Sequence, residues 1–124
     1  MIETYFSELE AVLRDFPAIR SYALTRKVYN LQQGFIGGKL VFENGHSLEF
    51  VEVINGEQVG KVKYRYQYMD EAQNLIFRYD NAPHYPDILS FPHHKHTPDR
   101  VVESQEPDLQ AVLFEISRME RKDE

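Results

Sequence analysis

The chain has 124 residues, with 14 Lys and Arg against 20 Asp and Glu, and its net charge of -6 argues against indiscriminate nucleic-acid binding. It has no cysteine, which excludes disulfides and thiolate zinc sites and fits a reducing cytoplasm. No segment has the apolar core of a signal peptide or the length of a membrane span. We therefore expect a cytoplasmic protein with a single domain over residues 1–124.

The N-terminal segment predicts an amphipathic helix. Apolar side chains from Ile2 to Phe16 recur at helical spacing, charged side chains take the opposite positions, and Pro17 ends the pattern. Residues 21–32 are rich in Tyr, Val, Thr and Leu and predict a first strand. Its alternation changes phase near Arg26, which indicates a bulge or bend at that point.

Glycines and Asn-Gly pairs divide the next region into strands. We interpret Gly34, Gly37 and Gly38 as the turn after the first strand, because their spacing does not match a phosphate-binding loop. Asn-Gly pairs are typical of tight turns between antiparallel strands. Two further strands, each followed by such a pair, are predicted over residues 39–43 and 47–54.

A second hairpin supplies the fourth and fifth strands, over residues 62–68 and 75–80. The connection between them is made of the turn-tolerant residues 70–73. Short turns join strands that run antiparallel, because parallel neighbours need a long crossover. The expected sheet is therefore an antiparallel meander of about five strands.

The regularity stops after residue 80. Four prolines between residues 83 and 98 argue against a helix or a central strand there, so we expect a long ordered loop, followed by a short extended piece at Val101-Val102. A closing helix begins near Glu106-Pro107 and frays over residues 122–124. The predicted fold class is α+β, with the N- and C-terminal helices packed on one face of the sheet.

The second hairpin has one aromatic and one basic face. Side chains along a strand alternate between faces, so Tyr64 and Tyr66 point one way while Lys63 and Arg65 point the other way. If Met69 pairs with Asn74, Arg65 faces Arg78 and Lys63 faces Asp80. Like charges held side by side are unfavourable in a sheet unless an anion or a carboxylate lies nearby. This register predicts an anion site.

The predicted loop is rich in histidine. His84 stands near its start, and His93, His94 and His96 are crowded near its end. Neighbouring side chains in an extended segment point in different directions, so at most two of these three rings can share a ligand with His84. Histidine titrates close to neutral pH and is the usual proton-transfer group in enzymes.

These residue types predict metal-free RNA cleavage. One group accepts the 2′-OH proton, another protonates the leaving oxygen, and cations stabilise the phosphate. Asp80 can orient a histidine, neutralise Lys63 or cap the strand end. The candidates for catalysis are His84, His93, His94, His96, Arg65, Arg78 and Asp80.

A second set of residues is predicted to contact the substrate. Aromatic rings can stack on bases, as they do in proteins that read single-stranded RNA. The parity of the tyrosines puts them on the face opposite the arginines, however, so core packing against the helices is the better explanation for most of them. The substrate-binding candidates are Lys63, Tyr64, Tyr66, Tyr79, Asn81 and Lys95.

Other interpretations of the same residues stay open. A non-catalytic module can use the same face to bind a protein partner, a nucleotide or RNA, and the histidine loop can simply be solvated. A metal-dependent phosphodiester hydrolase is the third alternative, but no HExxH or Cys/His spacing is present. We therefore expect no metal ligands and no cofactor.

The second half of the chain resembles the TumE-like family of small bacterial and archaeal toxins. The resemblance lies in the segments YRYQYMD, NLIFRYDNAPHYP, FPHHKH and VVES, which precede the closing helix, whereas the first half agrees only in its layout. It implies a toxin of a toxin–antitoxin pair with an antitoxin encoded nearby, and the protein partner of the non-catalytic alternative would be that antitoxin. The same segments contain the predicted catalytic residues. RNA is a further expected partner, and an exposed edge strand allows a homodimer.

Overall fold

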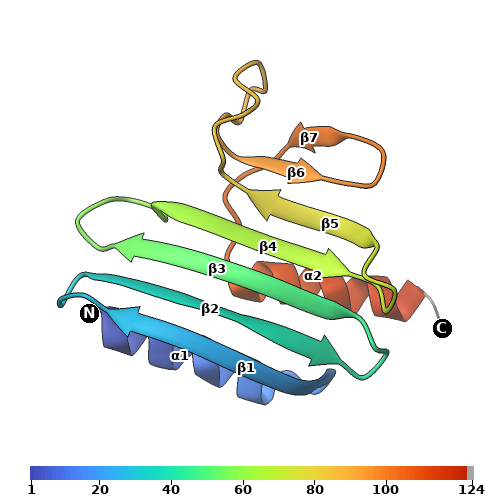
Figure 1. Cartoon of the computed structure of the whole chain (residues 1–124), viewed down its shortest axis with the longest axis horizontal. Coiled ribbons are helices and arrows are strands. Elements are labelled where there is room, and N and C mark those ends of the chain that lie inside the picture. The colour runs from blue at the N-terminus through green and yellow to red at the C-terminus, as the bar shows by residue number, and fades with distance from the viewer. Residues whose placement is uncertain (123–124) are drawn as a thin grey trace.

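The computed structural model describes residues 1–122, which form two helices and one seven-stranded sheet (Figure 1). The expected fraying of residues 123 and 124 lies outside the described part. The elements in chain order are α1 (Ile2–Asp15), β1 (Ile19–Val28), β2 (Gln33–Phe42), β3 (Ser47–Asn55), β4 (Lys63–Met69), β5 (Leu75–Asp80), β6 (His94–His96), β7 (Val101–Glu103) and α2 (Leu109–Lys122).

The strands form an antiparallel meander in sequence order, which confirms the predicted α+β class. The sheet has seven strands instead of the expected five or so, because it also contains the short strands β6 and β7. Of these two, only β6 lies in the segment predicted as a loop. Pro92 and Pro98 flank β6 and do not interrupt it, so its backbone is free to pair with β5 on one side and β7 on the other. The extended piece expected at Val101-Val102 is part of β7.

The role assigned to the glycines is wrong. Gly34, Gly37 and Gly38 lie inside β2, and the preceding turn is closed by Asn30, whose Oδ1 accepts the backbone N–H of Gln33 at 2.8 Å. A Cβ atom on Gly38 would lie 2.3 Å from the carbonyl oxygen of Ala23 in β1, so only glycine fits this close approach of two strands. The bulge in β1 falls between residues 19 and 21, and the pairing near the expected position is regular.

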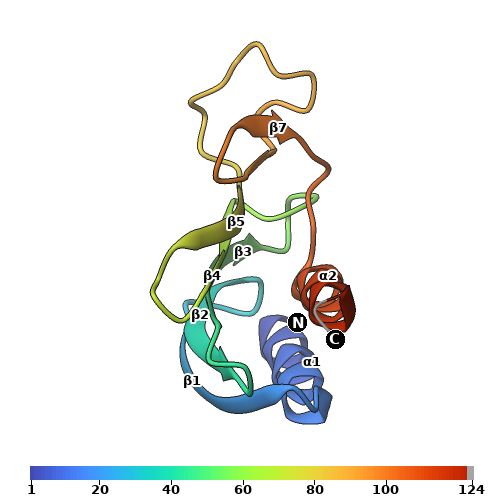
Figure 2. The same ribbon diagram turned by 90° about the vertical axis from the view of Figure 1, so that its right-hand side faces the viewer.

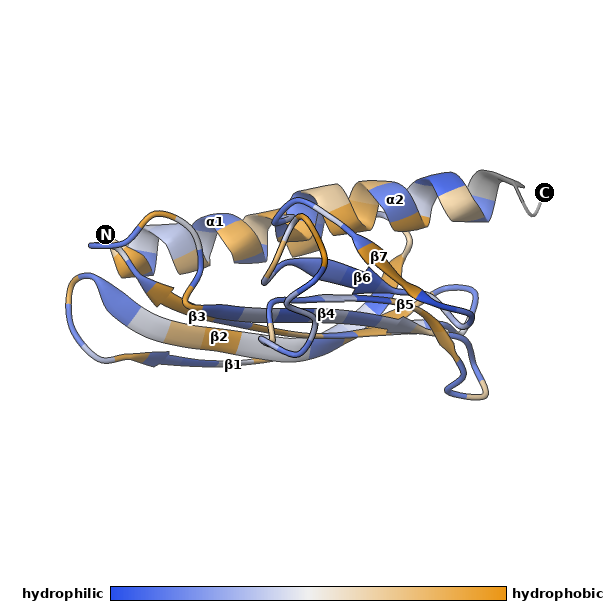
Figure 3. Cartoon of the chain, turned by 90° about the horizontal axis from the view of Figure 1, so that it is seen from above, coloured by the Kyte–Doolittle hydropathy of each residue, from blue (hydrophilic) through white to orange (hydrophobic). Residues whose placement is uncertain are grey.

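Both helices pack on the same face of the sheet, as Figure 2 shows from the side and Figure 3 from above. The apolar face of each helix packs into one shared core. Phe6 and Leu13 of α1 and Leu113 and Ile116 of α2 are all at most 2% exposed. α2 begins later than predicted, because Asp108 caps it by accepting the backbone N–H of Ala111 at 2.7 Å. None of the helices in residues 1–122 is long and apolar enough to cross a membrane.

A carboxylate lies inside this core. Glu52 of β3 is 0% exposed and accepts hydrogen bonds from the hydroxyls of Tyr5 in α1 and Tyr66 in β4, the latter at 2.5 Å. Burial and the Glu52 charge raise the pKa of both tyrosines far above the ordinary value, so both hydroxyls stay protonated and can donate. Glu52 therefore joins the N-terminal helix to the middle of the sheet.

Candidate functional site

The expected pairing of the second hairpin is wrong by two residues. Arg65 lies opposite Asp80, and Arg78 lies opposite Gln67, so neither of the predicted cross-strand pairs forms. A bulge between Tyr68 and Met69 shifts the register, and the turn that follows contains a residue with positive φ. Arg65 and Arg78 are nevertheless diagonal neighbours on one face of the sheet, and Asp80 stands beside both.

The crowded histidines belong to a strand, which fixes where each ring points. His94 pairs with Asp80 and His96 pairs with Arg78 across the β5–β6 ladder. Because side chains alternate along β6, His94 and His96 share the face that carries Arg65, the face away from the helices. His93 lies on the helix side, where its Nδ1 is 2.9 Å from the hydroxyl of Tyr64.

These side chains surround an open hollow of about 260 Å³ on the outer face of β4, β5 and β6. The start of the loop between β5 and β6 forms one wall of it. This hollow, called the basic hollow below, is lined by Lys63, Tyr64, Arg65, Arg78, Asp80, Asn81, Ala82, His84, Tyr85, His94 and His96.

Asp80 is the centre of the polar contacts in the basic hollow. Its Oδ2 accepts from Arg78 Nε at 3.0 Å and lies 3.3 Å from His96 Nε2. Its Oδ1 accepts the backbone N–H of Ala82 at 3.0 Å and lies 2.8 Å from His94 Nε2. One carboxylate therefore binds the Arg78 guanidinium and lies within 3.3 Å of two imidazole nitrogens.

His94 is held in one tautomer. Its Nδ1 lies 2.9 Å from the carbonyl oxygen of Pro92, and since a carbonyl only accepts, Nδ1 carries the proton. The ring is 1% exposed, and Nε2 makes no hydrogen bond, because its short contact with Asp80 lacks hydrogen-bond geometry. A buried ring nitrogen thus points at the carboxylate without a hydrogen-bond partner.

His96 is more accessible than His94, and its environment favours the neutral ring. Burial, followed by the positive charge of Arg78, lowers the pKa of His96, although Asp80 acts in the opposite direction. Arg78 Nη2 lies 3.2 Å from His96 Nε2, and since a guanidinium only donates, this contact places the lone pair on Nε2. Asp80 and Arg78 together orient the ring.

Several predicted substrate contacts lie elsewhere. Tyr66 is fully buried in the core, so its ring faces are covered, and Tyr64, although it lines the hollow, is only 1% exposed. Lys95 lies on the helix side, where it binds Glu115 of α2 at 2.7 Å beside the Tyr79 hydroxyl, which donates to the same carboxyl group. These residues have contacts typical of packing.

Asn81 continues the β4–β5 pairing beyond the end of β5. Its Oδ1 accepts the backbone N–H of Tyr64 at 3.1 Å, and its Nδ2 donates to the carbonyl of Val62 at 3.2 Å. Both contacts are structural, although the residue lines the hollow. Lys63, by contrast, is an exposed cation that lines the hollow, so among the substrate-binding candidates it is the one best placed to contact an anion there.

Sequence reasoning missed Tyr85. Its ring packs edge-on against His94 and His96, with centroids 5.0 and 5.8 Å away, and so limits how the two imidazoles can rotate. No local signal distinguishes this tyrosine from the others, because the contact is made across the loop and depends on the β5–β6 pairing.

The family model described as Toxin TumE matches residues 9–121 of the chain. The chain belongs to the TumE toxin family. The match covers nearly the whole chain, including the first half, where the resemblance lay only in the layout. No curated protein and no solved structure matches. Membership makes the chain a toxin component and implies a cognate antitoxin, but it assigns no chemistry to the basic hollow.

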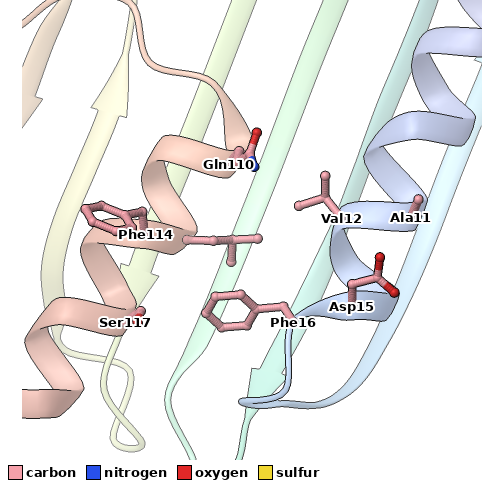
Figure 4. Close-up of a pocket in the computed structure, with 8 residues that line it drawn as sticks. Ala11, Val12, Asp15, Phe16, Gln110, Phe114 and Ser117 are labelled. Atoms are coloured by element: carbon pink, nitrogen blue, oxygen red, sulfur yellow. The ribbon is translucent and has the colours of Figure 1, made fainter.

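A second hollow of this TumE family member lies between α1 and α2, on the other side of the sheet (Figure 4). It measures about 400 Å³ and continues into a smaller one of about 210 Å³ that shares Val12 and Gln110 with it. Phe16 projects toward the space between the helices, whereas Phe114, which also lines the hollow and is 62% exposed, points from α2 away from α1. Its acidic residues are Glu8, Asp15 and Asp108, and no Lys or Arg among the described residues lines it.

Proposed function

We propose that this toxin is a metal-independent endoribonuclease and that the basic hollow binds and cleaves the RNA chain. The observation that supports the proposal is the presence of Lys63, Arg65 and Arg78 around one open hollow that also contains His84 and His96. Cations that converge on a small open space favour a phosphate, and imidazoles beside it can move protons. The net charge of -6 for the whole chain makes this basic hollow a local exception.

The proposed reaction transfers the phosphate to the neighbouring hydroxyl. Arg78 turns from His96 to a phosphate oxygen, which leaves the His96 Nε2 lone pair to accept the 2′-OH proton. The 2′-oxygen then bonds to phosphorus, the bond to the 5′-oxygen breaks, and His84 protonates that leaving oxygen. Arg65 and Arg78 stabilise the added negative charge on the phosphate. The products are a 2′,3′-cyclic phosphate and a 5′-hydroxyl.

Cleavage of RNA by the purified chain in the presence of EDTA tests this mechanism. We expect His96→Ala and His84→Ala to lower the rate by about 100-fold or more, the usual contribution of a general acid or base. His93→Gln is the matched control, because this ring lies on the opposite face and should change the rate only slightly. RNA left intact by the wild-type chain, with and without divalent metal, would remove the enzymatic proposal.

The alternative is a binding module that uses the same hollow without catalysis. Growth inhibition and antitoxin binding, measured in parallel on His96→Ala, separate the two functions. A catalytic hollow loses growth inhibition and keeps antitoxin binding. Loss of both together would show that the hollow is a docking surface.

The helix groove, defined by the two connected hollows between α1 and α2, is the proposed site for the antitoxin. An apolar floor between acidic side chains suits an amphipathic partner helix with basic residues beside its apolar stripe. The groove lies on the face away from the basic hollow, so an antitoxin there leaves the hollow open in the complex unless a further segment reaches round.

Phe114→Glu tests the helix groove. Placing a carboxylate where an apolar anchor is expected should weaken antitoxin binding by about 100-fold, because anchors of this kind carry most of the binding energy. Leu89→Glu is the control, since Leu89 is 93% exposed and lies outside the groove. Calorimetry with the purified antitoxin provides the measurement. Equal effects of the two substitutions would place the antitoxin elsewhere.

A further inference from the structure

We propose that Asp80, His94 and His96 form a binding site for a divalent transition-metal ion. One ligand atom from each residue lies within 4.8 Å of the others, on the paired ends of β5 and β6. The sequence predicted no metal ligands because the chain lacks a metal motif of known spacing. Strand pairing supplies what the linear pattern does not show, since it places Asp80 directly opposite the first histidine of a His-x-His segment.

His94 has the features of a metal ligand. Its Nδ1–H is donated to the Pro92 carbonyl, so in the neutral ring the lone pair lies on Nε2 and is directed at the cluster. Metal-ligating histidines almost always make this kind of second contact, because it fixes the tautomer and the orientation of the ring. The Nε2 atom is buried and has no hydrogen-bond partner, so an ion between it and Asp80 would remove an unfavourable approach of two acceptors.

His96 and Asp80 complete the donor set. The His96 lone pair also lies on Nε2, and Asp80 is 8% exposed and bears its charge between the two rings. Arg78 donates to both His96 and Asp80, so its guanidinium provides the positive charge that an ion would otherwise supply. Its side chain is 33% exposed and can turn toward solvent, which makes the guanidinium a competitor for the same ligands.

The donor set selects the class of ion. Two imidazoles and a carboxylate suit Zn²⁺ and its first-row neighbours, whereas Mg²⁺ and Ca²⁺ prefer oxygen ligands alone. Tetrahedral coordination at the usual bond lengths needs ligand atoms roughly 3.3 Å apart, so small rotations of the side chains are sufficient. Coordination positions not filled by these residues would face the basic hollow.

A bound ion has a direct consequence for RNA cleavage, and this consequence rests on the function proposed above. The metal-free mechanism needs the His96 lone pair to accept a proton. Coordination occupies that lone pair, so an ion at this site should inhibit cleavage, and removal of the ion should restore it. The protein would then be a toxin whose activity falls as free zinc rises.

The site is tested by titrating Zn²⁺ into the EDTA-treated full chain in the absence of RNA and measuring the heat of binding by calorimetry. We expect one ion per chain, with affinity lowered about 10-fold or more by Asp80→Asn and by His96→Ala. His93→Gln, on the same segment but the opposite face, should bind as the wild type does. Arg78→Gln should bind Zn²⁺ more tightly because the competing cation is gone. A misfolded variant would lose affinity, so a gain in affinity cannot be explained by poor folding.

Several outcomes would overturn the site: no saturable binding, equal losses in Asp80→Asn and His93→Gln, or weaker binding by Arg78→Gln. RNA cleavage is measured separately with Zn²⁺ and with EDTA. Inhibition by Zn²⁺ that EDTA reverses is the expected result. Cleavage that requires Zn²⁺ would support the ion site and overturn the metal-free mechanism, whereas zinc binding by a chain that cleaves no RNA would overturn only the proposed function.

Discussion

Arg65→Gln should lower the rate of RNA cleavage by about 100- to 1,000-fold, the usual cost of removing one charge-stabilising donor from an active site. Arg65 lies on the outer face of β4, where its side chain is exposed and lines the basic hollow. It is the cation opposite Asp80, and Arg78 is its diagonal neighbour. Arg78 already donates a hydrogen bond to Asp80, so Arg65 is the guanidinium more available to bind a phosphate.

Arg26→Gln is the matched control for this substitution. It removes the same charge from an exposed strand position, but Arg26 lies in β1 and forms an ion pair with Glu10 of α1, far from the hollow. Single-turnover cleavage of a short RNA gives the rate, and circular dichroism checks that both variants are folded. A similar loss in the two variants would indicate a general effect of net charge and would argue against the proposed phosphate contact.

The alternation of residues predicted the two faces of the second hairpin well, because the period of a strand is fixed by backbone geometry. Tyr64 and Tyr66 lie in the core, and Lys63 and Arg65 lie on the outer face, as their parity indicated. The result survived an error in the register, since a shift of two residues keeps every side chain on its original face. A shift of one residue would have inverted the whole hairpin.

The partner of each residue across the hairpin was not predictable from loop length alone. A bulge between Tyr68 and Met69 and a positive φ of 68° at Gln73 set the register, and glutamine is an unusual residue for that backbone conformation. The consequence for the site is large. Asp80, expected opposite Lys63, lies opposite Arg65 and also joins the histidines of β6.

The histidine segment shows a different limit of sequence reasoning. Three residues, His94–His96, are too short to display a strand pattern, and prolines on both sides favoured a loop. These residues form a strand because the edge of β5 offers backbone groups for them to pair with. That edge belongs to another segment of the chain, so the pattern of residues 94–96 does not reveal it. The types of residue at the site were thus evident from the sequence, whereas the sorting of His94 and His96 from His93 required the sheet.

Glu52 was predictable in part. It falls on the same parity as Leu48 and Phe50 in β3, so a carboxylate in that position had to be either buried or at the end of the apolar face. The tyrosines that satisfy it come from α1 and β4, and nothing in the linear sequence connects Tyr5 with Tyr66. Their association is a property of the helix-on-sheet packing.

Glu52→Ala should reduce the free energy of unfolding by about 4 kcal/mol, because it leaves two buried hydroxyls without an acceptor at roughly 1–3 kcal/mol each. Domains of this size have a total stability of about 5–15 kcal/mol, so we expect much of the population of this variant to unfold on mild heating. Glu49→Ala is the control, since Glu49 lies on the outer face of the same strand and should cost within about 0.5 kcal/mol. Urea unfolding measures both.

Removing all three polar partners should cost less than removing the carboxylate alone. In the variant Tyr5→Phe, Tyr66→Phe and Glu52→Met, no buried group lacks a partner, and apolar replacements of similar volume are often close to neutral. The double variant Tyr5→Phe and Tyr66→Phe, by contrast, leaves the Glu52 carboxylate without hydrogen-bond donors at a position that is 0% exposed. We expect this double variant to be severely destabilised. The cost is therefore expected to be strongly non-additive, because it comes from unpaired groups and disappears when none is left. Additive losses across these three variants would show instead that the three side chains stabilise the fold independently, by packing alone.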